Sequence, residues 1–206
     1  MEQIPGSDFE IWNKFRDGND YSLSLIYSKY AEVLYRYGLK FTGNRNIIED
    51  SIHDMFMDLI RNRKTIGETT NIQFYLLRTF RRKLTRKLKG ELRYGDDLAS
   101  EMIFDIHYSA ESEMISEEIK NNQIKQLHKA INNLSPRQKE AIYLKFQKEL
   151  DYNEISEILG MGIEACRNLI YRAIKSLRAL VPNDGNSPVL LLILKNSKNI
   201  LKYFQF

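Results

Sequence analysis

The sequence predicts an all-α fold, with two small helical domains joined by an acidic linker. Apolar residues recur at helical spacing through most of the 206 residues, and the alternating runs typical of strands are few. Only 4 prolines and 10 glycines interrupt this pattern. Residues 96–118 hold eight carboxylates and no Lys or Arg. We therefore expect a first domain over 1–95, an acidic linker over 96–120, a second domain over 121–181 and an apolar extension over 182–206.

The composition is typical of a soluble globular protein. Apolar residues make up 43% of the chain and charged residues 28%, with a net charge of +4. The single cysteine, Cys166, has no partner for an internal disulfide, which fits a reducing compartment. The first residues show no signal-peptide pattern, and the longest aliphatic run, 189–194, is far below the ~18 residues of a spanning helix. These features predict a cytoplasmic protein without membrane insertion.

Apolar periodicity predicts four helices in the first domain, over 8–15, 22–41, 46–61 and 71–89. The helix over 8–15 is expected to pack through three aromatic side chains, those of Phe9, Trp12 and Phe15. Gly43 is expected to close the second helix. Asn46 with Glu49, and Thr70 with Gln73, have the spacing of capping boxes at the starts of the third and fourth helices.

The third predicted helix carries a row of acidic residues. Asp50, Asp54 and Asp58 recur every four residues, with Glu49 and His53 beside them. Like charges at this spacing repel by a few tenths of a kcal/mol per pair, so helix stability does not explain the row. A cationic protein partner would explain it, and a plain solvated acidic face is the open alternative.

The fourth predicted helix is strongly basic. Seven positive charges fall within twelve residues without a negative one: Arg78, Arg81, Arg82, Lys83, Arg86, Lys87 and Lys89. Such a run favours an anionic partner that compensates the repulsion, nucleic acid first and an anionic membrane surface second. A solvated basic face is the alternative that this run alone leaves open.

The second domain has the pattern of a helix-turn-helix. A helix is expected around 121–133, and Ser135-Pro136 with Gln138 is a strong start for the next. Asp151 and Glu154 have the spacing of a further capping box, and Gly160 falls where a helix ends in a left-handed residue. A longer basic amphipathic helix follows from residue 163 until Pro182 stops it. Its expected buried face is Ile163, Cys166, Ile170, Ala173, Ile174, Leu177 and Val181. This arrangement is typical of duplex DNA binding, although an ordinary helical hairpin has a similar spacing.

Enzymatic patterns are weak in this sequence. His53-Asp54 is the dipeptide of metal-dependent HD phosphohydrolases, but no histidine precedes His53 as that family requires. Phosphate-binding glycine loops and catalytic serine or paired-carboxylate signatures are absent from the sequence. We therefore expect a protein that is not an enzyme and that needs no cofactor or metal.

Two blocks of the sequence resemble the extracytoplasmic-function (ECF) group of sigma factors in the sigma-70 family. In the first block, IEDSIHDMF at 48–56 is similar to a signature within the family's region two, and FYLLRTFRRKLTRKLK at 74–89 is similar to its promoter-melting helix. In the second, LSPRQKEAIYLKF and DYNEISEILGMGIEACRNLIYRAIKSLR resemble region four. The sequence departs from the usual pattern at His53, Asp54, Tyr75, Arg82 and Leu169.

The resemblance implies a role for each charged surface. It implies polymerase binding by Glu49, Asp50, His53, Asp54, Phe56 and Asp58. Recognition and melting of the −10 element would fall to Lys64, Thr65, Phe74, Tyr75, Arg78, Arg81, Arg82, Arg86 and Lys89, with the loop 61–71 forming part of a pocket for a flipped base. Contacts to the −35 element would come from Glu164, Ala165, Arg167, Asn168, Tyr171, Arg172 and Lys175. The implied partners are core RNA polymerase, promoter DNA and an anti-sigma factor.

Two readings of different classes compete with this one. A helix-turn-helix regulator that never joins polymerase would explain 150–181 but not the acidic row or the basic helix. A metal-dependent phosphohydrolase would require turnover that depends on His53 and Asp54. The apolar extension 182–206 lies outside the resemblance, and we expect it to pack within the chain. Binding of a regulator such as an anti-sigma factor and an end that is merely prone to aggregate are the open alternatives.

Overall fold

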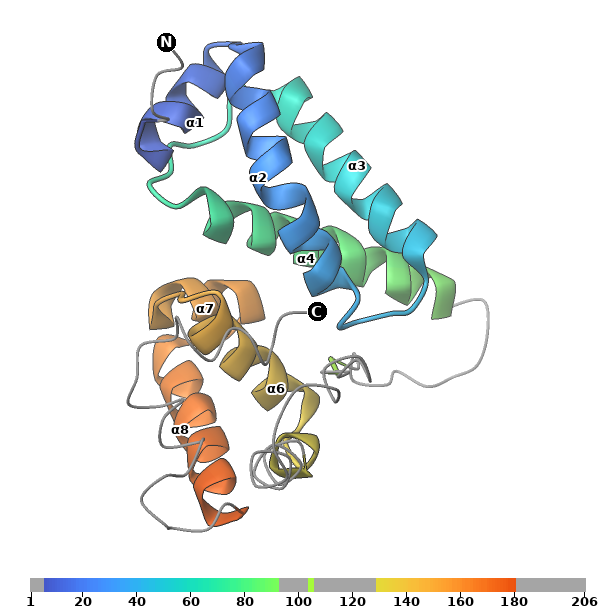
Figure 1. Ribbon diagram of the computed structural model, residues 1–206, viewed down its shortest axis with the longest axis vertical. Coiled ribbons are helices and arrows are strands. Elements are labelled where there is room, and N and C mark those ends of the chain that lie inside the picture. Colours follow the sequence, from blue (N-terminus) through green and yellow to red (C-terminus); the bar gives the residue numbers. More distant parts are fainter. Residues whose placement is uncertain (1–5, 93–103, 106–128, 181–206) are drawn as a thin grey trace, which may run out of the picture. The chain divides into compact units, whose positions relative to one another are not determined.

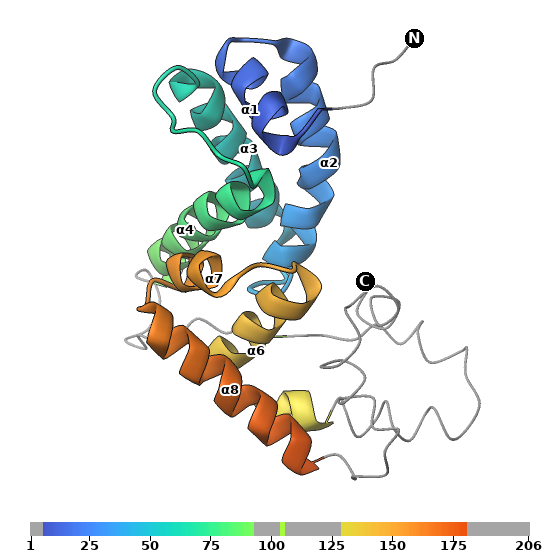
Figure 2. The same ribbon diagram turned by 90° about the vertical axis from the view of Figure 1, so that its left-hand side faces the viewer.

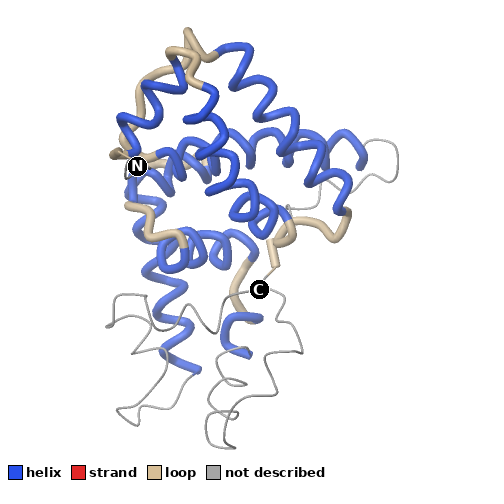
Figure 3. The backbone as a smooth tube through the Cα atoms, turned by 45° about the horizontal axis from the view of Figure 1, so that its top comes forward, coloured by secondary structure: helices blue, strands red, loops and turns tan. Residues whose placement is uncertain are grey.

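The computed structural model describes residues 6–92, 104–105 and 129–180, and the apolar extension lies outside these ranges. The chain divides into two compact units, residues 1–100 and 101–206. Helices account for the regular secondary structure of the described ranges, and no strand occurs in them (Figure 3). The all-α prediction is therefore confirmed.

Unit 1 is a bundle of four helices: α1 (Asp8–Arg16), α2 (Asp20–Gly38), α3 (Arg45–Asn62) and α4 (Ile72–Leu92) (Figure 1). The core residues come from all four helices and include Trp12, Tyr37, Met55, Leu77 and Phe80, each 0% exposed. Trp12 and Phe15 are buried as predicted, but Phe9 is not part of the core, because 41% of its surface is exposed.

Three helices of unit 1 approach each other closely at Gly38, the last residue of α2. A Cβ placed there would lie 2.7 Å from Cγ2 of Ile48 and 3.1 Å from Cζ of Phe80. Gly38 therefore lets α2 touch α3 and α4 at one point, which a larger residue would prevent.

Several predicted helix ends in unit 1 are wrong by one or more residues. Helix α2 ends at Gly38, so Gly43 does not close it. Helix α3 begins after Asn44, whose side chain accepts the N–H of Ile47, and not after Asn46. Helix α4 begins after Asn71, whose Oδ1 accepts the N–H of Phe74, so Thr70 does not occupy the cap position.

Unit 2 contains a helical turn at 129–132, α6 (Pro136–Ile142), a π-helical turn η2 (Tyr143–Gln147), α7 (Tyr152–Leu159) and α8 (Ile163–Leu180). Helices α6 and α7 both pack against α8 (Figure 2). The capping boxes predicted at Ser135 and Asp151 are both formed, and Gly160 has the expected left-handed φ of 63°. These local predictions are confirmed.

Two residues of the acidic segment belong to the core of unit 2. Phe104 is 1% exposed, and its ring centroid lies 5.6 Å from that of Tyr143. Asp105 Oδ1 accepts a hydrogen bond from Nζ of Lys139 at 2.8 Å. These contacts attach the segment to α6 and the turn that follows it.

Candidate nucleic-acid and docking surfaces

The basic helix α4 has two differently charged environments along its length. Lys83 Nζ lies 2.5 Å from Oδ2 of Asp58, and Lys87 Nζ lies 2.7 Å from Oδ2 of Asp54. We call these two ion pairs the α3–α4 ladder. The anionic partner inferred from the run of seven charges is therefore not needed for Lys83 and Lys87, because α3 already supplies their counter-charges.

The arginines expected to contact the −10 region lie mostly outside this ladder. Arg78, Arg82, Arg86 and Lys89 are exposed, and Arg81 is half-buried. Arg78, Arg82 and Arg86 recur every four residues, so they form one row along α4. This row is the part of α4 best placed to meet phosphate groups.

The acidic row of α3 is divided by the ladder. Glu49, Asp50 and His53 are exposed, whereas Asp54 and Asp58 are engaged by lysines of α4. The hydrogen bond from Lys87 is the main reason that the pKa of Asp54 lies below its usual value. Glu49, Asp50 and His53 are therefore more available to a cationic partner than Asp54 and Asp58, which the lysines of α4 already contact.

Phe56, also expected at the polymerase-binding surface, is only 5% exposed. Its ring packs 4.9 Å from the ring of Tyr27 on α2, whose side chain is 52% exposed. Phe56 therefore supports the exposed ring of Tyr27 and offers little surface of its own to a partner. Sequence reasoning missed Tyr27, although an aromatic residue off the apolar stripe of its helix was a usable signal.

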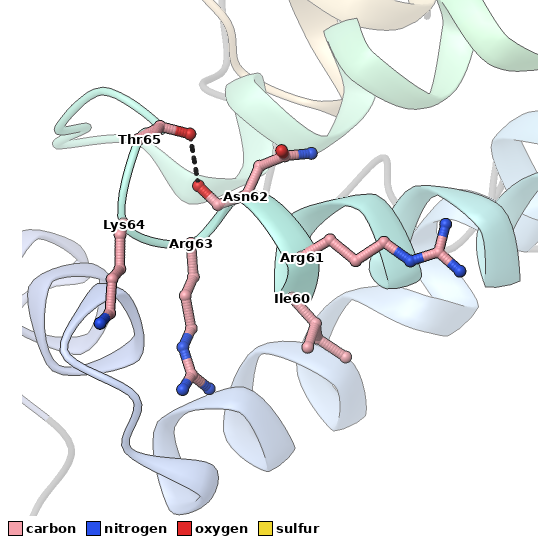
Figure 4. A pocket seen from close by; sticks show the side chains of 6 residues that line it. All are labelled: Ile60, Arg61, Asn62, Arg63, Lys64 and Thr65. Atoms are coloured by element: carbon pink, nitrogen blue, oxygen red, sulfur yellow. Dashed lines mark hydrogen bonds between the residues drawn. The ribbon is translucent and has the colours of Figure 1, made fainter.

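A pocket of about 400 Å³ lies where α3 ends and the loop that leads to α4 begins. Its lining combines three cationic side chains with polar and apolar groups: Ile60, Arg61, Asn62, Arg63, Lys64 and Thr65 (Figure 4). Thr65 Oγ1 donates to the carbonyl oxygen of Asn62 at 3.0 Å, which tightens the turn that carries Lys64. The predicted residues Lys64 and Thr65 thus lie together at this pocket.

Phe74 and Tyr75 do not line that pocket, although the same site was expected to include them. Tyr75 lies in the first turns of α4, where its ring centroid is 4.7 Å from that of Trp12. Desolvation there raises the pKa of the Tyr75 hydroxyl. Tyr75 is half-buried against α1, so it joins the start of α4 to α1 more than it faces solvent.

Helix α8 separates a buried face from an exposed one. Cys166, Ile170, Ala173 and Leu177 are at most 5% exposed, and burial raises the pKa of the Cys166 thiol. All residues expected to contact the −35 element are exposed: Glu164, Ala165, Arg167, Asn168, Tyr171, Arg172 and Lys175. Tyr171 is the most exposed large apolar residue of the described ranges, at 65%.

Two of these α8 residues interact with each other in the free chain. Arg167 donates to Oε1 of Glu164 at 2.7 Å, and its guanidinium lies 5.8 Å from the ring centroid of Tyr152 in α7. Both Arg167 and Glu164 are more than half exposed at the side chain. Such a pair is weak in water, so it can open when a phosphate or base edge competes for Arg167.

The described residues contain no group of three or more His, Cys, Asp or Glu that could hold a metal ion. His53 and Asp54 are neighbours on α3, but Asp54 faces Lys87. Within the same ranges, no helix has the length and apolar character needed to cross a membrane.

An exposed basic face on a helix-turn-helix, together with a second basic helix in the four-helix unit, is the arrangement expected of a DNA-binding protein. The family model of sigma-70 region 4 matches residues 124–177. The chain is also 24% identical over 178 residues to the ECF RNA polymerase sigma factor BldN of Streptomyces coelicolor, covering 85% of this chain and 66% of BldN. It is 24% identical over 164 residues to the ECF RNA polymerase sigma factor SigM of Bacillus subtilis, covering 78% of this chain and 96% of SigM.

Solved structures agree with the fold. CnrH, in complex with the cytosolic domain of CnrY, matches 88% of this chain and all of its own chain with a TM-score of 0.55 at 15% identity. The sigma factor RpoE, in complex with the anti-sigma factor NepR from Bartonella quintana, matches 78% of this chain and 94% of its own chain with a TM-score of 0.52 at 20% identity. The region 4 family model and the two relatives support the resemblance to ECF sigma factors of the sigma-70 family that was noted in the sequence.

Proposed function

We propose that this protein directs core RNA polymerase to specific promoters in the cytoplasm and takes part in initiation without performing bond chemistry. Helix α8 would enter the major groove of the −35 element, with Glu164, Ala165 and Asn168 toward base edges. Arg167, Tyr171, Arg172 and Lys175 would lie closer to the phosphates. The observation that carries this proposal is the exposure of all seven residues opposite a buried apolar face.

Unit 1 would act on the −10 element. The row of Arg78, Arg82 and Arg86 would bind phosphates, with Arg81 and Lys89 beside it. The pocket at Lys64 and Thr65 would receive a base flipped out of the opening duplex. Flipping costs a few kcal/mol, and binding of the exposed base would offset that cost for the correct sequence.

Polymerase would dock on the part of the acidic row that the lysines of α4 do not contact. Glu49, Asp50 and His53 are accessible to a basic helix of the polymerase, with Tyr27 as a neighbouring apolar contact held by Phe56. Asp54 and Asp58 would contribute through the electrostatic field of the row, because Lys87 and Lys83 already contact them. An anti-sigma factor would act by covering one of these surfaces.

Run-off transcription tests the proposal directly. Purified core polymerase with this protein should start RNA at defined sites on genomic fragments of the source organism, and core polymerase alone should not. Failure to start RNA on any such fragment would refute the sigma-factor activity. Mapping the start sites would also supply the promoter needed for the finer tests.

A polymerase pull-down separates this function from that of a helix-turn-helix regulator. Asp50→Arg places a positive charge on the exposed row without touching the ladder, and it should weaken polymerase binding. Lys87→Met is the matched control, because it breaks a ladder pair but leaves Asp50 in place. Normal retention of the Asp50→Arg variant by core polymerase would contradict the assigned docking surface.

A further inference from the structure

Helix α1 contacts the loop that leads into α4, which we define as residues 63–71. The indole Nε1–H of Trp12 donates to the carbonyl oxygen of Gly67 at 2.9 Å. One turn further along α1, Arg16 NH1 lies 3.2 Å from Oε1 of Glu68. Figure 1 shows this loop passing beside α1 before α4 begins. Two consecutive loop residues are thus held by two side chains of α1.

The same helix also fixes the first residue of α4. Asp8 Oδ2 accepts the backbone N–H of Ile72 at 3.0 Å, across 64 residues of sequence. Asp8 is in turn held on α2, because Tyr30 donates to Oδ2 at 3.3 Å and Lys29 Nζ lies 3.4 Å from Oδ1. A carboxylate at this point also favours the start of α4 electrostatically, since the amino end of a helix carries partial positive charge.

The turn between α1 and α2 makes a third contact, with the pocket itself. Gly18 has a φ of +94°, and a Cβ placed on it would lie 3.2 Å from NH2 of Arg63. Arg63 lines the pocket, and in Figure 4 its side chain extends toward the pale blue amino-terminal helices. The turn therefore borders the cationic side of the pocket as well.

We propose that α1 is a positioning element for promoter opening, with Trp12, Arg16 and Asp8 as positioning residues that act through the loop. The proposal rests on the function proposed above and adds residues that the sequence did not mark for it. None of the three is placed against DNA. Their effect is to hold Lys64, Thr65 and the start of α4 in one geometry before DNA arrives.

The physical gain is preorganisation. Fixing the backbone of a residue costs conformational entropy, and a loop that is ordered only on binding adds that cost to base capture. Contacts to Gly67, Glu68 and Ile72 lower this cost within the free protein. Loss of the contacts should weaken base capture and strand opening more than polymerase binding, which uses α3.

The test uses the full-length protein, core polymerase and a promoter mapped by run-off transcription. Trp12→Phe removes the indole N–H but keeps a ring beside Tyr75, and Glu68→Gln removes the charge that Arg16 contacts. Arg36→Met is the control, because it removes an exposed ion pair with Glu32 within α2. Open complexes are measured on the duplex promoter, on the same promoter with one −10 substitution, and on a template already unpaired at −10.

Loss of one hydrogen bond corresponds to about a threefold to tenfold change. Trp12→Phe is therefore expected to form open complexes more slowly on duplex DNA by that factor and to discriminate less between the two promoters. Glu68→Gln should show a smaller change in the same direction. The defect should shrink on the unpaired template, polymerase binding should stay normal, and Arg36→Met should match the wild type.

Unchanged discrimination in both α1-loop variants would overturn the proposal, and so would an equal defect on duplex and unpaired templates. If Trp12→Phe fails to bind polymerase, Glu68→Gln decides, because the Glu68 side chain is 62% exposed and does not support the core. If the wild-type protein starts no RNA at all, the sigma-factor activity fails first, and this result is distinct from a failure of α1 positioning.

Discussion

Nζ of Lys87 on α4 lies 2.7 Å from Oδ2 of Asp54 on α3, and the neighbouring pair of Lys83 and Asp58 follows one turn away. The two lysines are four residues apart on their helix, and so are the two aspartates. Charges that repel along each helix therefore attract across the pair of helices. The ladder explains why an acidic row and a basic run coexist in one small bundle.

Breaking the ladder should return Asp54 to ordinary titration. Because the hydrogen bond from Lys87 is the largest cause of the lowered pKa, Lys87→Met should raise the pKa of Asp54 toward its usual value. A folded-state pKa below the unfolded one stabilises the fold above pH ~4, and that contribution is lost as pH falls through the folded pKa. NMR titration of the carboxyl groups measures the change. Asp54 titrating identically in the variant would contradict this cause.

The stability effect of the same variant should be small. Both side chains are substantially exposed, at 33% for Lys87 and 50% for Asp54, so the pair is worth less than about 1 kcal/mol at neutral pH. Urea unfolding followed by the fluorescence of Trp12, the single tryptophan, reports on unit 1 alone. A loss of several kcal/mol would show that the ladder supports the bundle more than two exposed ion pairs can.

Gly38→Ala should destabilise unit 1 by about 1–3 kcal/mol through overpacking. Alanine is the better helix former by about 1 kcal/mol, but its Cβ would meet the buried side chains of Ile48 and Phe80. Gly90→Ala is the control, because Gly90 is helical and exposed, and a Cβ added there would meet nothing within 4 Å. If Gly38→Ala gains stability as Gly90→Ala should, the close approach at Gly38 does not constrain the bundle.

Cys166 should be unreactive while unit 2 is folded. Its side chain is 0% exposed, and burial raises the pKa of the thiol, so the reactive thiolate is scarce near neutral pH. A disulfide reagent should label the native protein about 100-fold or more slowly than the urea-unfolded protein, since reaction requires local opening. Rapid labelling in native buffer would show that the α8 core opens readily. As the single cysteine of the chain, Cys166 reports on unit 2 alone.

Asp105→Ala should destabilise unit 2 by about 1–3 kcal/mol. Lys139 is only 11% exposed at its side chain and would lose its carboxylate partner. The double variant Asp105→Ala, Lys139→Met should recover most of the loss, because replacing both partners leaves no buried charge behind. The labelling rate of Cys166 in urea measures each variant. Equal losses in the single and double variants would show that the ion pair itself is not the cause.

Local sequence signals predicted unit 2 well. Ser135 and Asp151 each bind backbone groups three residues away, and the left-handed turn at Gly160 needs no distant contact. The exposed face of α8 follows from helical spacing once one face is apolar. Such features depend on a few neighbouring residues, so a single sequence reveals them.

Features set by distant contacts were missed. Asn71, and not Thr70, caps α4, and Asp8 of α1 accepts the N–H of Ile72 at the same helix start. Helix α2 ends at Gly38, where three helices meet. The ladder joins residues 25 and 33 positions apart, and the Trp12–Gly67 bond spans 55. Helical periodicity assigns each residue a face but does not state which residue of another helix will lie opposite it.

The ladder also bears on how salt affects DNA binding. Each cation that neutralises a phosphate of duplex DNA releases counterions and adds about 0.9 to the slope of log affinity against log salt. Lys83 and Lys87 already face carboxylates, so moving either one to a phosphate would exchange one anion for another and release fewer ions. The number of basic residues on α4 therefore overstates the ionic component of its DNA affinity, which the row of Arg78, Arg82 and Arg86 should dominate.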